Sequence, residues 1–287
     1  MRIFLTGGNG FIGKHLLPLL NRHEVLCLSH SAPATDTPRT IRGDLNAPAS
    51  YADELERFRP ECCVHLAWSG LPDYSLASCR MNLLAGISLF EMLGRVGCGR
   101  IFVAGTCWEY GTLQGSVMEE MHGQEVNLFA AFKSALQTLG QSMCAVSGSR
   151  FGWGRLFFVY GPGPRPTSLV PSWYRSFKQG IAPSISNPLA INDFVYVTDA
   201  AAAICTLVEA EDAAGIFNIG SGRPIAVWEV VNLVAAQMGL PAAYVDMPAT
   251  ASGFWSDSAK VRSHGWQPEL SLPDGIAKTL AALEAEQ

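Results

Sequence analysis

Short apolar runs alternate along the first 160 residues with segments whose apolar residues recur at helical spacing. The runs predict buried strands at Arg2–Leu5, Glu24–Leu28, Cys62–Leu66, Arg100–Ala104 and Arg155–Val159. The segments between them predict helices at Phe11–Asn21, Tyr51–Phe58, Ser75–Gly94 and Leu128–Val146. In the last segment, one apolar stripe is formed by Phe132, Leu136, Leu139 and Met143. This alternation predicts an α/β fold with a doubly wound parallel sheet and helices on both faces.

The pattern loosens at Gly161-Pro162-Gly163-Pro164-Arg165-Pro166, a proline- and glycine-rich stretch typical of turns. We therefore expect a first domain over residues 1–161 and a smaller α/β lobe for substrate over residues 162–287, with part of 190–219 returning to the first domain. The later elements are predicted to be helices at Ser172–Gln179, Asp199–Val208 and Ala226–Met238, and strands at Asp193–Val197 and Gly215–Ile219.

Composition narrows the classes of function. Of 287 residues, 48% are hydrophobic and only 16% charged, which excludes a disordered chain. Twenty basic and 25 acidic residues give a net charge of −5, and no basic run occurs, so no nucleic-acid partner is expected. The apolar runs are shorter than the roughly 20 residues that cross a bilayer, and the N-terminus lacks a signal-peptide pattern. We therefore expect no membrane association and a cytoplasmic location.

The eight cysteines do not have the spacing of a zinc site, because no CxxC pair occurs. Cys62 and Cys63 are adjacent within a predicted buried strand. We expect no metal site, and we interpret seven cysteines as small buried side chains in a reducing compartment. Cys107 is the exception, because it stands beside a candidate catalytic residue.

A glycine-rich loop, Thr6-Gly7-Gly8-Asn9-Gly10-Phe11-Ile12-Gly13, follows the first strand and opens the first helix. It satisfies GxGxxG, in which glycines permit a tight turn and close approach of a pyrophosphate to a helix N-terminus. The strand–turn–helix context favours a dinucleotide-binding loop over a glycine-rich turn without a ligand. The expected cofactor contacts here are Gly7, Asn9, Gly10, Phe11, Ile12 and Gly13.

The end of the second predicted strand indicates which dinucleotide binds. An NAD-binding domain is expected to place an acidic residue there, but this chain has Ser29-His30-Ser31. These side chains can donate hydrogen bonds to a 2′-phosphate, and Arg39 or Arg42 is expected near them. NADP(H) is therefore preferred, while NAD(H) stays open.

Eight further segments extend this pattern in order along almost the whole chain. They are Gly43-Asp44-Leu45, His65-Leu66-Ala67-Trp68, Asn82-Leu83-Leu84-Ala85-Gly86, Thr106-Cys107-Trp108-Glu109-Tyr110-Gly111, Arg155-Leu156-Phe157-Phe158-Val159-Tyr160-Gly161-Pro162, Asn192-Asp193-Phe194-Val195-Tyr196-Val197-Thr198-Asp199, Phe217-Asn218-Ile219-Gly220-Ser221-Gly222, and Asp257-Ser258-Ala259-Lys260 with Gly265-Trp266-Gln267-Pro268. Together with the glycine loop they resemble the extended short-chain dehydrogenase/reductase family of nucleotide-sugar epimerases, dehydratases and reductases. The resemblance implies a Rossmann domain and adds to the cofactor site Asp44, Leu45, Leu66, Ala67, Trp68, Phe157 and Val159.

The same resemblance implies a catalytic set of Tyr-x-x-x-Lys and a Ser or Thr. Lys133 fits the lysine, which binds the nicotinamide ribose, and Thr106 fits the hydroxyl partner. The residue four before Lys133 is Phe129 rather than tyrosine, and no tyrosine lies between Tyr110 and Tyr160. Phenylalanine keeps the ring but has no proton to transfer. The change should cost most of the ~10²–10⁴-fold that general acid–base catalysis contributes.

Several explanations of Phe129 remain open. The residue is an engineered replacement of tyrosine, or the protein uses another acid, or it binds nucleotides without turnover. A plain core role on the helix is less favoured, because Phe129 shares a face with Lys133. The candidate replacement acids are Cys107, Glu109, Tyr110 and His122.

Other departures from the family pattern bear on the substrate. Sugar 4,6-dehydratases carry Asp-Glu after the threonine, where this chain has Cys107-Trp108, so a dehydratase is disfavoured. Phe158 stands where the family has an asparagine that helps to place the substrate, and Asn192 stands where it often has an arginine that contacts the nucleotide phosphates. A diphosphate would then be recognised by other residues, for which Arg165, Arg175 and Arg223 are the candidates. The expected substrate contacts are Asn82, Cys107, Phe158, Arg165 and Asn192.

We therefore expect an NAD(P)-dependent ketoreductase or epimerase of a nucleoside-diphosphate sugar. The alternatives are a catalytically silent NADP-binding sensor or partner protein, and a reductase or epimerase of a non-nucleotide substrate. Family members dimerise through the helices matching Ser75–Gly94 and Leu128–Val146, so a homodimer is expected.

Overall fold

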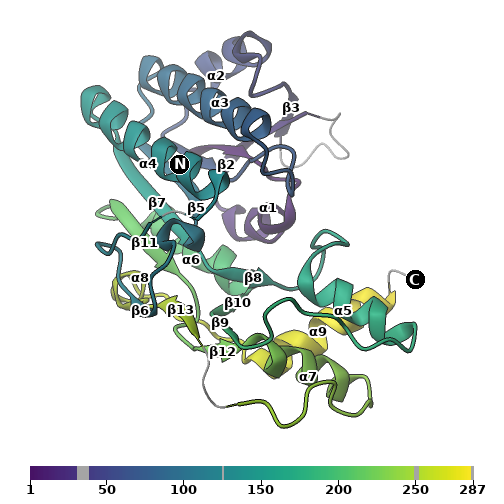
Figure 1. Ribbon diagram of the computed structural model, residues 1–287. Helices are drawn as coiled ribbons and strands as arrows, with labels where there is room; N and C mark the ends of the chain where they lie inside the picture. Colours follow the sequence, from purple (N-terminus) through teal and green to yellow (C-terminus); the bar gives the residue numbers. More distant parts are fainter. Residues whose placement is uncertain (31–38, 125, 249–251, 286–287) are drawn as a thin grey trace.

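The computed structural model describes residues 1–30, 39–124, 126–248 and 252–285. Seven strands form one parallel sheet in the order β11-β7-β5-β4-β1-β2-β3 (Figure 1). These strands are β1 (Arg2–Thr6), β2 (Glu24–Ser29), β3 (Arg39–Arg42), β4 (Cys62–His65), β5 (Arg100–Thr106), β7 (Arg150–Leu156) and β11 (Gly215–Ile219). The chain winds outward from β1 in both directions, which confirms the predicted doubly wound parallel sheet.

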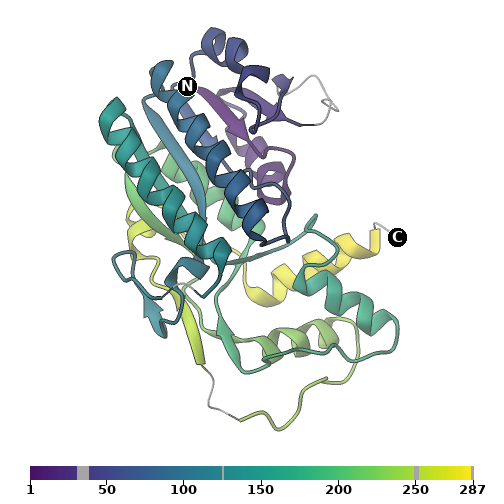
Figure 2. The same ribbon diagram turned by 45° about the horizontal axis from the view of Figure 1, so that its top comes forward.

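Helices cover both faces of this sheet, because successive strand residues point to opposite sides. On one face, Ile3 and Leu5 pack with α1 (Phe11–Leu16) and α6 (Val197–Glu209). On the other, Phe4 packs with a layer formed by α2 (Ala52–Phe58), α3 (Leu76–Arg95) and α4 (Leu128–Ser147). Figure 2 shows α3 and α4 side by side along that face.

The second lobe contains two small sheets. One pairs β8 (Phe158–Tyr160) with β10 (Phe194–Tyr196), and the other has the order β12-β9-β13-β6. The remaining elements are β6 (Gly115–Val117), β9 (Ala190–Asn192), β12 (Ile225–Ala226), β13 (Ser252–Ser256), α5 (Leu169–Lys178), α7 (Val227–Gln237), α8 (Ala259–Ser263) and α9 (Leu272–Ala285). Since β11 and α6 lie with the first sheet, the chain crosses between the lobes more than once. A domain boundary at Gly161 stays a prediction.

Asp193 connects these parts of the chain. Its buried carboxylate accepts hydrogen bonds from the backbone and hydroxyl of Ser221 at 2.7 and 2.6 Å, and from the backbone N–H of Gly222 at 2.9 Å. The backbone and hydroxyl of Ser256 also donate to it, at 3.1 and 2.5 Å. One carboxylate thus holds together the turn after β11, strand β13 and the start of β10.

Two predicted elements differ from the structure. The helix expected over Phe11–Asn21 is α-helical only to Leu16 and continues as a 3₁₀ turn over Leu17–Leu20, because Pro18 has no N–H for the helical ladder. The strand expected at Arg155–Val159 is wrong in its bounds, since β7 begins at Arg150 and a separate β8 follows it. The edge strand β3 was not predicted.

The buried face of α4 is formed by Phe129, Lys133, Leu136, Gly140 and Cys144. The predicted stripe was wrong at Leu139, whose side chain is 40% exposed. A buried lysine and a glycine do not register as apolar positions, so the hydrophobic pattern placed the face too far round the helix. A Cβ at Gly140 would lie 2.7 Å from the Phe151 ring, which explains the glycine.

Helix α3 has 20 residues and a mean hydropathy of 1.3, so it meets the length and composition of a membrane span, which the sequence analysis did not expect. Half of the 18-residue stretch that has this hydropathy is buried within the fold. Its buried residues include Leu89, Phe90 and Leu93, which pack in the same cluster as the first sheet and α4. Packing against the sheet and α4 accounts for the apolar side chains of the buried half.

Candidate active site

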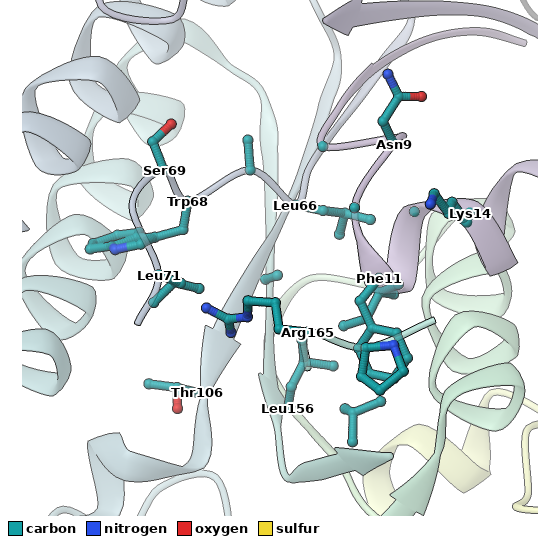
Figure 3. A pocket seen from close by; sticks show the side chains of 18 of the residues that line it. Asn9, Phe11, Lys14, Leu66, Trp68, Ser69, Leu71, Thr106, Leu156 and Arg165 are labelled. Carbon is teal, nitrogen blue, oxygen red and sulfur yellow. The ribbon is translucent and has the colours of Figure 1, made fainter. Parts of the chain in front are cut away.

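Two adjoining cavities lie at the carboxyl ends of the strands, near the switch point between β1 and β4. At this point the order in which strands are added to the sheet changes direction. The first, of about 790 Å³, is lined by the glycine loop, residues 66–71 and Lys133. The second, of about 440 Å³, extends toward β8 and α5 of the second lobe. Thr106, Phe129 and Arg165 line both cavities. In the view of Figure 3, Asn9 stands at one end of the first cavity and Thr106 at the other, with the Arg165 side chain between them.

The glycine loop turns tightly at the edge of the first cavity. Gly7 has φ +77°, and a Cβ there would lie 2.8 Å from the backbone nitrogen of Ala67. A Cβ at Gly13 would lie 2.2 Å from the Gly7 carbonyl oxygen, so α1 packs directly against the turn. Of the predicted loop contacts, all six (Gly7, Asn9, Gly10, Phe11, Ile12 and Gly13) line this cavity.

Thr6 and His65 position the segment that faces the glycine loop. The Thr6 hydroxyl and His65 Nδ1 are 2.7 Å apart in a buried pair, and the Ala67 N–H donates to the same hydroxyl at 3.4 Å. Burial, and secondarily the charge of Lys133, lower the pKa of His65 to about 3, so this imidazole stays neutral. Leu66, Ala67 and Trp68 are thereby held in the wall of the first cavity. Phe157 and Val159 line it as well.

A further cavity of about 340 Å³ lies beyond the glycine loop, where the adenosine half of a dinucleotide is expected. Its wall includes Asn9, Ser29, His30, Asp44 and Leu45. Asn9 donates to the Ser29 hydroxyl at 3.1 Å, and His30 Nδ1 lies 3.9 Å from the Asp44 carboxylate. The backbone N–H of Asn46 holds the pKa of Asp44 below its ordinary value, which keeps the carboxylate charged.

The two arginines expected near this cavity are separated by the register of β3. Arg42 is paired with Ser29, at the end of β2 beside the cavity. Arg39 is paired with Leu26 farther along the strand, and its guanidinium lies 2.7 Å from Glu54. Ser31 lies outside the described residues.

Thr106 and Lys133 approach the boundary of the two cavities from β5 and α4. Thr106 ends β5 and caps the following 3₁₀ turn, Cys107–Tyr110, by accepting from the Trp108 N–H at 3.3 Å. The buried Lys133 ammonium donates to the Ala104 carbonyl at 2.7 Å and lies 4.2 Å from the Trp68 ring centre. Burial lowers the pKa of Lys133 to about 8.

Phe129 lies in an aromatic cluster at the junction of the cavities. Its ring centre is 5.3 Å from Trp68, 5.8 Å from Trp108 and 5.2 Å from Tyr74. The Lys133 ammonium is 5.9 Å from the same ring, as expected for residues one helical turn apart. The hydrocarbon ring of Phe129 thus stands where the resemblance implies a phenol.

Of the four candidate replacements for that phenol, Glu109 and Tyr110 are engaged in hydrogen bonds elsewhere. Glu109 is buried, accepts from Arg155 Nε at 2.9 Å and from Trp153 Nε1 at 3.0 Å, and supports the turn after β5. The Tyr110 hydroxyl donates to Asn218 at 2.6 Å. Cys107 lines the second cavity, but burial raises the pKa of its thiol well above the ordinary value. His122 is exposed and lines neither of the two cavities. Tyr74, which the sequence analysis did not single out, lines the second cavity.

The expected substrate contacts divide into two groups. Cys107, Phe158 and Arg165 line the second cavity. Asn82 does not reach it, because its amide binds the backbone of Ser69, accepting at 2.7 Å and donating at 2.9 Å. Asn192 in β9 lines neither adjoining cavity.

The three arginines expected to bind a diphosphate are also separated. The Arg175 guanidinium donates to the Pro166 carbonyl, and Arg223 lines a different cavity in the second lobe. Arg165 is therefore the one of the three that faces both adjoining cavities.

The first cavity fits a dinucleotide. Its volume is within the ~300–1,000 Å³ typical of ligand sites. Its wall combines a glycine turn that allows close approach with the ammonium of Lys133, and Trp68 Nε1 is buried without a partner among the described residues. All eight cysteines are free and buried, and the described part of the chain has no group of three or more His, Cys, Asp or Glu that could hold a metal.

Comparisons with known proteins agree with this geometry. A sequence model of the NAD dependent epimerase/dehydratase family matches residues 3–220. GDP-6-deoxy-D-mannose reductase of Pseudomonas aeruginosa is 27% identical, over 99% of this chain and 97% of its own length. The dTDP-4-dehydro-6-deoxyglucose reductase of Escherichia coli is 24% identical, over 99% and 98% of the two chains. The structure of MoeE5 in complex with UDP-glucuronic acid and NAD superposes with a TM-score of 0.87 at 26% identity and covers 100% of both chains.

Relatives of similar identity include a dTDP-glucose 4,6-dehydratase and a probable UDP-glucuronate 4-epimerase. Relatedness by itself therefore does not select one reaction.

Proposed function

The chain belongs to the NAD dependent epimerase/dehydratase family, and from this premise we propose that it is an NAD(P)(H)-dependent reductase or epimerase of a nucleoside-diphosphate sugar. The observation that carries the proposal is the junction of the two cavities at Thr106 and Phe129. A dinucleotide in the first cavity and a sugar in the second would meet there. Cys107-Trp108 in place of the dehydratase Asp-Glu supports reduction or epimerisation over dehydration.

The residues at the junction have separable roles in this proposal. The nicotinamide, when bound, supplies or accepts the hydride. Thr106 orients the reacting oxygen through its hydroxyl, and Lys133 holds the nicotinamide ribose through its ammonium. Arg165 faces both cavities, so its guanidinium is suited to the phosphate groups of the cofactor or of the substrate. Phe158 lines the sugar side.

Preference for NADP(H) over NAD(H) is part of the proposal. Ser29 ends β2 and His30 follows it. An acidic residue at this place would repel a 2′-phosphate, but this chain has none there, and Arg42 on β3 is in register with Ser29. Asp44 lies 3.9 Å from His30 and remains suited to the adenine amino group. NAD, which is bound in the MoeE5 structure, remains an accepted cofactor in this proposal.

We also propose a homodimer that forms through α3 and α4. The outer surface of these two helices exposes large apolar side chains, namely Leu76, Met81, Leu84, Leu128, Leu139 and Val146. A second copy of the same surface would bury them. Light scattering at micromolar concentration should give twice the chain mass, and a monomer would exclude the dimer.

The eight buried free thiols support a reducing, cytoplasmic location.

The test of the enzymatic proposal is NADPH oxidation with a panel of GDP-, dTDP- and UDP-linked 4-keto-6-deoxy sugars. Turnover by the protein or by Phe129→Tyr, lost in Lys133→Ala, is the expected result. Tight NADPH binding without turnover by either protein would reject it. That outcome would favour a silent nucleotide-binding protein, the second candidate, for which the absent phenol at 129 is the specific observation.

A further inference from the structure

Tyr74 places a phenol beside the ring that lacks one. It lies in the segment between β4 and α3, and its ring centre is 5.2 Å from Phe129 and 5.5 Å from Trp108. The side chain is 37% exposed and lines the second cavity together with Thr106. A tyrosine side chain thus lies next to the junction, in contact with Phe129, although it comes from a different segment than the family pattern predicts.

Hydrogen bonds hold the segment that carries Tyr74. The Asp73 N–H donates to the Gly70 carbonyl at 2.8 Å, and the backbone and hydroxyl of Ser75 donate to the Asp73 carboxylate at 2.9 and 3.1 Å. At its start, the Ser69 backbone is clamped by the amide of Asn82. Asn82, one of the expected substrate contacts, thus positions this segment in the structure.

The Tyr74 hydroxyl is available for proton transfer. No hydrogen-bond partner for it occurs among the described residues, whereas Tyr110 is committed to Asn218. Tyr160 lines the same cavity, but it is buried and burial raises the pKa of its phenol well above the ordinary value. Of the tyrosines lining the second cavity, Tyr74 is the exposed one.

We propose that Tyr74 supplies the catalytic proton that Phe129 cannot. The inference rests on the proposed function. When a keto-sugar is reduced, the carbonyl carbon gains one hydride from the reduced nicotinamide, and the carbonyl oxygen takes the phenolic proton of Tyr74 to become a hydroxyl. The resulting phenolate regains a proton from water. Thr106 donates a hydrogen bond to the same oxygen and orients it.

The test compares four forms of the full chain in the keto-sugar and NADPH assay: unmodified, Tyr74→Phe, Phe129→Tyr and the double variant. Tyr74→Phe keeps the ring that contacts Phe129 and Trp108, so the NADPH Kd and the fold should be preserved. We expect kcat to fall by about 10²–10⁴-fold, the usual contribution of a general acid. Adding Phe129→Tyr should restore turnover. Tyr51→Phe is the matched control, because its buried hydroxyl has no hydrogen-bond partner among the residues that the structure describes, and it lines neither cavity.

The outcomes separate this inference from the proposed function. If the unmodified chain turns over and Tyr74→Phe changes its kcat by less than twofold, the role of Tyr74 is overturned and the proposed function stands. Turnover that appears only with Phe129→Tyr also overturns it, while the proposed function stands. A loss in Tyr74→Phe that is accompanied by lost NADPH binding and not restored by Phe129→Tyr shows a structural role instead. Inactivity of all four forms rejects the proposed function and this inference with it.

Discussion

Replacing Lys133 with methionine is expected to stabilise the protein at pH 7, although the lysine is proposed to hold the cofactor. The ammonium is buried, and burial lowers its pKa from an ordinary value of 10.5 to about 8. At 1.36 kcal/mol per pKa unit, that difference corresponds to about 3 kcal/mol against the charged native state. Methionine fills similar space without the charge but loses the hydrogen bond to Ala104, which contributes about 1 kcal/mol. The expected net gain is about 2 kcal/mol.

The pH dependence of this gain has a definite sign. Below pH 8 the lysine is charged in both the native and the unfolded states, so the native state bears the full cost. Between pH 8 and 10.5 the unfolded chain retains a proton that the native state has released, so native stability rises with pH. The advantage of Lys133→Met should therefore shrink across this range and vanish below pH 10.5, at the pH where the falling cost of the charge equals the contribution of the lost hydrogen bond.

Urea unfolding followed by circular dichroism at pH 7 and pH 10 measures both quantities, with each variant compared with the unmodified protein at the same pH. Lys278→Met on the exposed face of α9 is the matched control and should change stability by less than about 0.5 kcal/mol. A Lys133→Met protein that is less stable at pH 7, or whose difference is the same at both pH values, would refute the reasoning. The variant should also bind NADPH more weakly, which would show that the lysine is retained for function.

Three other substitutions test the remaining parts of the site and fold. Gly13→Ala should weaken NADPH binding at least about tenfold by titration calorimetry, because its Cβ would lie 2.2 Å from the Gly7 carbonyl oxygen and displace α1 from the turn; binding within twofold would contradict this. Asp193→Asn should lower the free energy of unfolding by about 3–5 kcal/mol in urea, since an amide cannot accept all the donors that converge on this carboxylate; a loss below 1 kcal/mol would be inconsistent with the network. Arg42→Ala should raise the Kd of NADPH about tenfold and leave that of NADH unchanged; equal effects on both would place the 2′-phosphate elsewhere.

The features that sequence predicted best depend on neighbouring residues. The glycine loop was recognisable because the turn, the start of α1 and the end of β1 all lie within residues 6–13. The parallel sheet could be predicted because each strand and each helix has its own local apolar pattern, and their alternation along the chain is typical of a parallel sheet. Strand β7 was misplaced because Gly152 and Gly154 interrupt its apolar run. A Cβ at either glycine would come within 3.1 or 2.7 Å of Phe102 on the neighbouring strand, a contact that no local pattern contains.

The catalytic position shows a similar division. Counting four residues back from Lys133 predicted that Phe129 stands where the resemblance implies a tyrosine, and the structure places the two side chains one helical turn apart, because a helical turn is a local spacing. The spatial neighbours of that ring come from two other segments: Trp68 and Tyr74 lie between β4 and α3, and Trp108 lies in the turn after β5. Nothing in the spacing of Tyr74 relative to Phe129, 55 positions later, marks it as a possible donor.

The amino-acid sequence alone was therefore enough to predict the fold class, the glycine turn between β1 and α1, and a phenylalanine where the resemblance implies a tyrosine, since each depends on short runs of adjacent residues. The tertiary structure decided which side chains meet at the junction of the two cavities. It engaged Glu109 with Arg155 and Tyr110 with Asn218, and it brought Tyr74 to Phe129. Such pairings depend on how strands and loops distant in sequence converge at one edge of a sheet, where burial and hydrogen bonding select which groups remain free to react.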